Sequence, residues 1–214
     1  MIKKRVYFIG LTLLSLVVSS GFIRLEEQKI NGFHLDYNEK MKYHVANEFE
    51  NEESVRNTLT NIEKSFASFA KKMAYKESRG MLHLVNPYGY MGKYQFGKSA
   101  LRTVGIYDFK EFLRNAQWQD KAFEALVAKN KWLLRKEIQK YSGKNINGIE
   151  ITESGLIAAA HLGGAGSVKR FLRSNGSRRF KDGFGTSISS YMKKFADYDI
   201  STINAEVNPK VNLE

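Results

Sequence analysis

Glu77 is the first residue whose type and position suggest chemistry. From Val55 onward, apolar residues recur in steps of three and four along one face of a predicted helix over 55–77, and Glu77 continues that face. A carboxylate among apolar side chains is poorly solvated, which favours its neutral, proton-carrying form. Such a group can serve as a general acid, as the cleavage of a glycosidic bond requires. The alternative is an ordinary surface acid at a helix end, or one paired with Lys76.

Residues 81–97 follow that helix and are rich in Gly, Asn, Pro and Tyr. This composition predicts a loop of the kind that often carries function. Its aromatic rings suit a sugar-binding wall because they can stack on pyranose faces, and core packing is the alternative for each. The rings are those of Tyr88, Tyr90, Tyr94 and Phe96. Asp108, Glu153 and Asp182 are further carboxylates without a distinguishing context, and we interpret them as solvated surface charges.

Four short segments share the order and spacing of a known family. They are Glu77-Ser78, Asn86-Pro87, Gly92-Lys93-Tyr94-Gln95-Phe96 and Ala158-Ala159-Ala160-His161-Leu162-Gly163-Gly164-Ala165-Gly166. Together they resemble the soluble lytic transglycosylase and goose-type lysozyme domain, over roughly residues 60–200. In that family a Glu-Ser pair ends a helix, and a Gly-x-Met-Gln segment places its Gln 18 residues after the Glu. Gln95 follows Glu77 by the same 18 positions.

The resemblance implies a role for each matching residue. Glu77 would be the catalytic acid/base, and Tyr191 would stand for a late family tyrosine near that carboxylate. The side chains implied to bind substrate are Ser78, Tyr94, Gln95, His161 and Tyr191. For Ser78 the alternative is a hydrogen bond to backbone only, for His161 a structural role, and for Tyr191 a place in the core.

Two departures from the family pattern concern substrate binding. The family Met is Tyr94 here, and the family Tyr-Asn pair is His161-Leu162, which removes an amide contact to sugar. These changes leave the choice between anhydro product and hydrolysis open. The run of glycines after Leu162 lacks the Lys-Ser/Thr ending of a phosphate-binding loop, so we interpret it as close packing or a sugar-binding turn.

The function implied is that of a peptidoglycan lytic transglycosylase, which cleaves the β-1,4 bond between N-acetylmuramic acid (MurNAc) and N-acetylglucosamine (GlcNAc) and leaves 1,6-anhydro-MurNAc ends. The expected partner is the peptidoglycan glycan strand. The alternatives are a hydrolytic lysozyme-type muramidase, a non-catalytic wall-binding module on the same fold, and a cationic protein that acts on membrane surfaces through charge alone.

The elements that must position these residues are predicted to be helices. Besides the helix over 55–77, apolar periodicity and capping residues predict helices over 98–104, 109–113, 118–141, 153–162, 167–172 and 187–198, and residues 142–151 form a loop between the two halves. The fold class is therefore mainly α, a lysozyme-like helical domain with at most a small β-hairpin.

The chain of 214 residues has room for one such domain with appendages. Lys3, Lys4 and Arg5 precede an apolar run, so residues 1–23 are predicted to be a signal peptide or, through residues 6–23, a membrane anchor. Residues 24–50 form a linker or arm, residues 51–200 the domain, and residues 201–214 a C-terminal tail. The expected location is the periplasm or cell envelope.

The net charge and the absence of cysteine limit the kinds of binding partner and the kinds of chemistry that we expect. The formal net charge is +12, and residues 66–214 alone carry +12 from 25 basic and 13 acidic side chains. Such a field attracts polyanions, and export argues against nucleic acid. The chain contains no cysteine, which excludes thiol catalysis and thiolate metal sites. We expect no cofactor and no metal.

Overall fold

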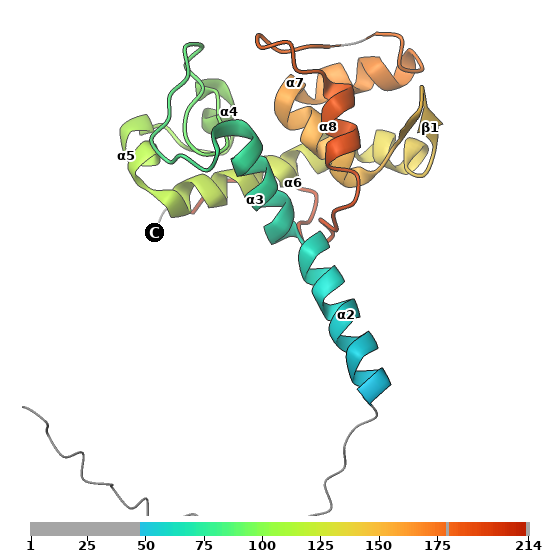
Figure 1. Cartoon of the computed structure of the whole chain (residues 1–214). Coiled ribbons are helices and arrows are strands. Elements are labelled where there is room, and N and C mark those ends of the chain that lie inside the picture. The colour runs from blue at the N-terminus through green and yellow to red at the C-terminus, as the bar shows by residue number, and fades with distance from the viewer. Residues whose placement is uncertain (1–47, 179, 213–214) are drawn as a thin grey trace, which may run out of the picture. The chain divides into compact units, whose positions relative to one another are not determined.

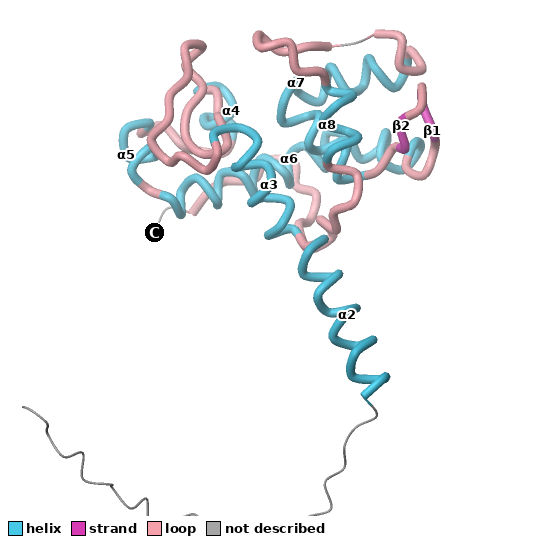
Figure 2. Tube along the Cα trace, in the orientation of Figure 1, coloured by secondary structure: helices cyan, strands magenta, loops and turns pink. Residues whose placement is uncertain are grey.

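The computed structural model describes residues 48–178 and 180–212, where the chain is mainly helical (Figure 1). The elements, in chain order, are α2 (Glu48–Lys64), α3 (Phe66–Ser78), α4 (Lys98–Thr103), α5 (Phe109–Arg114), α6 (Ala116–Tyr141), β1 (Asn145–Ile146), β2 (Ile149–Glu150), α7 (Glu153–Arg173) and α8 (Ile188–Lys194). The two strands form an antiparallel hairpin (Figure 2). The prediction of a mainly α fold with a small hairpin is confirmed. The predicted signal or anchor lies outside the described residues.

The helix predicted over 55–77 is in fact two helices, which break at Ser65. The Ser65 hydroxyl accepts a hydrogen bond from the amide of Ser68 at 3.3 Å and so caps a new helix, α3. On α3, Phe69 and Met73 are fully buried. The apolar residues of α2 are more than half exposed: Val55, Leu59 and Ile62. The predicted buried face is therefore correct for α3 and wrong for α2.

The core gathers around α6, which runs between the part of the domain built from α4 and α5 and the part built from α7 and α8 (Figure 1). Phe123 of α6 packs on Phe69 of α3, with ring centroids 5.9 Å apart. Phe195, just after α8, meets Phe69 edge-on at 5.6 Å. These contacts fix α3 against α6 and α8, and with it the orientation of Glu77.

Helix α7 contains one interruption, at Gly164, where φ 75° and ψ 154° are non-helical. The helices predicted over 153–162 and 167–172 are its two halves. Thr152 caps the first half by accepting a hydrogen bond from the amide of Gly155 at 3.1 Å. Helix α8, predicted over 187–198, ends at Lys194.

The C-terminal segment packs on the domain as far as it is described. The amide of Glu206 donates to the carbonyl of Ala128 at 3.1 Å, and the amide of Val211 donates to that of Val104 at 2.9 Å. Pro209 between them is buried. Residues 201–212 thus belong to the domain, where the sequence predicted a tail.

Candidate active site

Glu77 lies in the last turn of α3 and is half-buried, at the wall of a cavity. The helix ends directly after it because Arg79 and Gly80 take left-handed conformations, with φ 56° and 80°. One carboxylate oxygen of Glu77, Oε1, accepts a hydrogen bond from the Tyr191 hydroxyl at 2.6 Å. The structure therefore brings together the two residues that the resemblance implies to be neighbours.

Tyr191 comes from the middle of α8 and is 2% exposed. Burial raises the pKa of its phenol well above the usual range, and the negative charge of Glu77 and the hydrogen bond to it act in the same direction. The phenol thus stays protonated and can donate to Glu77 at any physiological pH. It is a core tyrosine and a cavity residue at once, because its ring also packs 5.5 Å from Phe195.

Gln95 lines the same cavity and is half-buried. Its backbone has φ 52°, an uncommon conformation for a residue with a side chain. Its amide nitrogen Nε2 donates to the carbonyl of Gly92 at 2.9 Å and more weakly to that of Leu84 at 3.4 Å. These bonds hold the side chain in place and leave the amide oxygen without a partner among the described residues.

His161 also lines the cavity, from the first half of α7. Its ring nitrogen Nε2 lies 2.8 Å from the carbonyl oxygen of Tyr94, so Nε2 carries a hydrogen and donates it. The ring packs edge-on against Phe96 and Phe123. The other nitrogen, Nδ1, is buried and has no hydrogen-bond partner in the part of the chain that the structure describes. His161 therefore fixes the 91–96 loop and closes the inner wall of the cavity.

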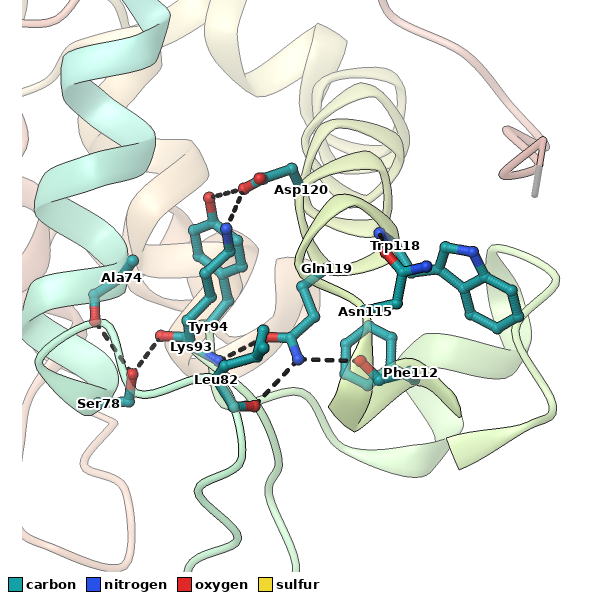
Figure 3. A network of polar contacts seen from close by, with 10 residues as sticks. All are labelled: Ala74, Ser78, Leu82, Lys93, Tyr94, Phe112, Asn115, Trp118, Gln119 and Asp120. Atoms are coloured by element: carbon teal, nitrogen blue, oxygen red, sulfur yellow. Dashed lines mark hydrogen bonds and ion pairs between the residues drawn. The ribbon is translucent and has the colours of Figure 1, made fainter. Parts of the chain in front are cut away.

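Ser78 is not part of the cavity. It is buried, and its hydroxyl lies 2.8 Å from the carbonyl oxygen of Lys93 and 3.3 Å from that of Ala74, both of which accept from it (Figure 3). The alternative of a hydrogen bond to backbone is the one observed. Ser78 thus ties the end of α3 to the loop that carries Gln95.

Tyr94 also points away from the cavity, into the core. It is 3% exposed, and its ring stacks on that of Phe123 with centroids 4.2 Å apart. Its hydroxyl donates to Asp120 at 2.7 Å, and the Lys93 ammonium group pairs with the same carboxylate at 2.7 Å (Figure 3). Burial raises the pKa of the Tyr94 phenol well above its usual range, and the hydrogen bond to Asp120 adds to this. Tyr94 lines a second cavity of about 870 Å³ between α3 and α6 that does not include Glu77.

The Glu77 cavity has a volume of about 660 Å³ and aromatic walls. Of the four loop aromatics proposed for a sugar-binding wall, Tyr88 and Tyr90 line it, whereas Tyr94 and Phe96 are buried in the core. The full lining is Lys76, Glu77, Asn86, Tyr88, Tyr90, Gln95, His161, Leu162, Phe180, Lys181, Asp182, Gly183, Phe184, Thr186 and Tyr191.

Asp182 is a carboxylate in this cavity, where the sequence predicted a solvated surface charge without a distinguishing context. Its Oδ1 accepts hydrogen bonds from the amides of Phe184 at 3.0 Å and Thr186 at 2.7 Å. Asp182 lines the same cavity as Tyr191, and its charge contributes to the raised pKa of that phenol. The other two carboxylates lie elsewhere: Asp108 caps α5, and Glu153 pairs with Lys131 at 3.1 Å.

Gln119 is the second residue that sequence reasoning missed. It is fully buried on α6, and its amide oxygen accepts from the amide of Lys93 at 2.7 Å (Figure 3). Its amide nitrogen donates to the carbonyls of Leu82 at 3.0 Å and Phe112 at 2.9 Å. A Cβ at Gly92 would lie 2.5 Å from the Gln119 oxygen, so this motif glycine makes room for the buried amide. The sequence did contain a signal for this role, because Gln119 is a polar residue at a core position of the helix predicted over 118–141.

Among residues 48–178 and 180–212, no group of three His, Asp or Glu side chains is arranged to hold a metal ion. In the same part of the chain, no helix is long and apolar enough to cross a membrane. Comparisons with models of protein families, with curated proteins and with solved structures find no match to this chain.

Proposed function

We propose that this protein is an exported peptidoglycan lytic transglycosylase on a lysozyme-like domain, with Glu77 as its catalytic acid/base. One observation carries the proposal. Glu77 and Tyr191, 114 positions apart in the sequence, share a 2.6 Å hydrogen bond at the wall of a cavity with aromatic walls. Gln95 and His161, which the resemblance also implies, line the same cavity.

The lining of the cavity suits an acidic glycan. Aromatic rings offer faces for pyranose stacking, and Gln95 offers an amide oxygen for a sugar hydroxyl. The volume of about 660 Å³ is within the range of small-ligand pockets. Lys76 and Lys181 flank the two acidic residues and suit the carboxylates of MurNAc and its peptide. The net charge of +12 would draw the protein to such a polymer.

In the first step Glu77 donates a proton to the oxygen that joins MurNAc C1 to GlcNAc C4. Since Tyr191 donates to Oε1, the acidic hydrogen of Glu77 resides on Oε2 and faces the substrate. The C1–O bond breaks, the GlcNAc unit leaves with a hydroxyl at C4, and positive charge develops at MurNAc C1 and its ring oxygen.

In the second step the Glu77 carboxylate takes a proton from the hydroxyl at C6 of the same MurNAc unit. The C6 oxygen forms a bond to C1, which gives the 1,6-anhydro ring and returns Glu77 to its protonated form. The reaction consumes no water. It also requires no second carboxylate as nucleophile.

Asp182 favours a second candidate, a hydrolytic muramidase. A carboxylate in the same cavity would take a proton from a water molecule that attacks C1, as in inverting glycosidases, where an acid and a base face the bond from two sides. The two candidates differ in their products, because hydrolysis leaves a reducing MurNAc end and transglycosylation does not. Mass spectrometry of digested sacculi, with and without borohydride reduction, distinguishes them. Under transglycosylation, Asp182→Asn would still yield anhydro ends.

The test of the active site is Glu77→Gln, which keeps size and hydrogen bonding but removes the transferable proton. We expect solubilisation of purified sacculi to fall by about 10²- to 10⁴-fold, the usual contribution of a general acid/base. Circular dichroism and sacculus binding should be unchanged. Glu63→Gln, the same change at an exposed position on α2, is the matched control and should retain full activity.

Three results would overturn the proposal. An active Glu77→Gln protein would show that the acid is elsewhere. A wild-type protein that binds sacculi without releasing muropeptides would instead be a wall-binding module, and one that binds only anionic vesicles, in a fully salt-sensitive manner, would be a membrane-surface protein.

A further inference from the structure

Two turns that are distant in sequence and both line the Glu77 cavity meet through aromatic side chains. The Tyr88 ring contacts the Phe184 ring edge-on, with centroids 5.0 Å apart and planes at 83°. The Tyr88 hydroxyl also donates to the carbonyl of Gly183 at 3.3 Å, across 95 positions of sequence. Tyr88 and Phe184 both line the cavity, so their contact joins two segments of its lining.

Each turn is braced by a side chain before it reaches across. In the first turn, Asn86 Oδ1 accepts hydrogen bonds from the amides of Tyr88 at 2.9 Å and Tyr90 at 3.0 Å. In the second, Asp182 accepts from two amides in the same manner. Such side-chain-to-backbone bonds hold a turn in one conformation without a partner strand. The rings of Tyr88 and Phe184 are therefore presented to each other by preformed turns.

Gly183 shows that the approach is close. A Cβ at this position would lie 3.0 Å from the Tyr88 ring, which is closer than most real Cβ contacts. The two turns meet at a point where one of them has no side chain. The contact therefore depends on residues of both turns: Tyr88 in the first, and Gly183 and Phe184 in the second.

The Tyr88–Phe184 contact lies at an exposed edge of the cavity, whereas Tyr191, which holds Glu77, is buried. Tyr88 and Phe184 are 60% and 63% exposed and Tyr191 is 2% exposed. The aromatic contact therefore forms an exposed bridge between two segments of the cavity lining. A polymer that passes beneath this bridge must either thread one of its ends or first separate Tyr88 from Phe184.

We propose that the Tyr88–Phe184 contact restricts the enzyme to the ends of glycan strands, so that it releases short products from a terminus and seldom cuts inside a strand. This inference rests on the proposed function. Access to an internal segment requires separation of the two rings and loss of the Tyr88 hydrogen bond, whereas access to a strand end does not. Loss of either ring should open the cavity to internal segments.

The test uses peptide-free glycan strands sorted into short and long fractions at equal strand concentration. An enzyme that acts at ends cleaves both fractions at the same initial rate per strand, because each strand offers the same number of ends. An enzyme that cuts internally works faster on long strands in proportion to their length. Chromatography of early products gives a second readout, since only internal cuts yield fragments of intermediate length.

For the wild type we expect equal initial rates on both fractions and few intermediate fragments. Phe184→Ala should raise the share of intermediate fragments by roughly two- to tenfold and make the rate depend on length. Tyr107→Ala is the matched control, because it removes an exposed ring outside the cavity and should behave as the wild type.

Two outcomes overturn the inference alone: a wild-type initial rate that rises in proportion to strand length with intermediate fragments as the main early product, or a Phe184→Ala product pattern identical to that of the wild type. A wild-type protein that cleaves no strand of any length overturns the proposed function together with this inference. The two failures are therefore distinguishable in one experiment.

Discussion

Tyr191 determines which oxygen of Glu77 is left free of this hydrogen bond. Its hydroxyl occupies Oε1 at 2.6 Å, and its own position is fixed by burial and by the ring contact to Phe195. A carboxyl group that can rotate freely presents its proton in several directions, whereas one held on a single oxygen presents it in one. In the proposed mechanism this orientation matters twice, because the same oxygen donates the first proton and accepts the second.

Tyr191→Phe tests this orientation at the scale of one atom. The phenyl ring keeps its packing, so the fold should be retained, and only the hydrogen bond to Glu77 is lost. We expect kcat on soluble glycan strands to fall by about 10- to 100-fold with little change in KM, the range for a hydrogen bond to a charged group. Tyr198→Phe removes a phenol outside the cavity and should have no effect. An unchanged kcat in Tyr191→Phe would exclude an orienting role.

At the same scale, the sequence predicted some site residues and not others for geometric reasons. Neighbours on a helix point about 100° apart, so Glu77 faces the cavity while Ser78 faces the loop behind it. The side chains of Tyr94 and Gln95 likewise point in different directions. Gln95 takes a left-handed conformation that turns its side chain toward the cavity, whereas the Tyr94 ring lies in the core. A motif match supplies residue identity, and local backbone geometry decides which side chain reaches the substrate.

At the scale of elements, the 81–96 loop is held from behind by α6. It contains little regular structure, yet it carries two cavity aromatics and Gln95. Gln119 provides two hydrogen bonds to this loop, at Leu82 and Lys93, and a third to the carbonyl of Phe112 in α5, all from a fully buried position. The loop therefore depends on one amide group for much of its rigidity.

Gln119→Met should test that dependence, because methionine has a similar volume and cannot replace the hydrogen bonds. Three backbone groups would lose their partner, and we expect the free energy of unfolding to fall by about 3 kcal/mol. Urea unfolding followed by tryptophan fluorescence measures the change. Gln117→Met, at an exposed position on the same helix, should leave stability within about 0.5 kcal/mol of the wild type. A Gln119→Met protein as stable as this control would contradict the assigned role.

Helix boundaries show where periodicity stops being informative. The apolar positions of α2 and α3 are in phase, so a count of steps cannot separate one long helix from two. Ser65 was the local signal, since its hydroxyl caps α3. At Gly164 the same kind of local reading succeeded, because a glycine with φ 75° separates the two halves of α7 where the sequence predicted an end.

At the scale of the whole molecule, contacts distant in sequence had no local signal. Lys131 lies within the α6 stripe, yet its ammonium group is buried by the C-terminal segment. It donates to the carbonyls of Ile200 at 3.0 Å and Ile203 at 2.8 Å and pairs with Glu153. The two partners in the C-terminal segment are backbone carbonyls, which any residue type supplies, so composition and motif could not predict that residues 201–212 belong to the domain.

Buried phenols give the whole molecule a testable response to alkaline pH. Burial raises the pKa of Tyr94 above its usual value of about 10, which an unfolded chain would retain. Below about pH 10 the Tyr94 phenol is protonated in both the folded and the unfolded chain, so it does not lower the free energy of unfolding. As pH rises further, only the unfolded chain releases the proton, so stability falls by about 1.4 kcal/mol per pH unit for this phenol.

Tyr94→Phe removes this phenol and keeps the ring that stacks on Phe123, while Asp120 keeps its pairing with Lys93. We therefore expect the free energy of unfolding to fall less steeply with pH in the variant than in the wild type above about pH 10. The difference in slope should correspond to about one proton. Urea unfolding at pH 9, 10 and 11 measures the difference, which isolates Tyr94 from the lysines that titrate in both proteins. Tyr107→Phe, at an exposed phenol, should follow the wild-type slope. Equal slopes for Tyr94→Phe and the wild type would show that the Tyr94 phenol ionises in the folded protein as readily as in the unfolded chain.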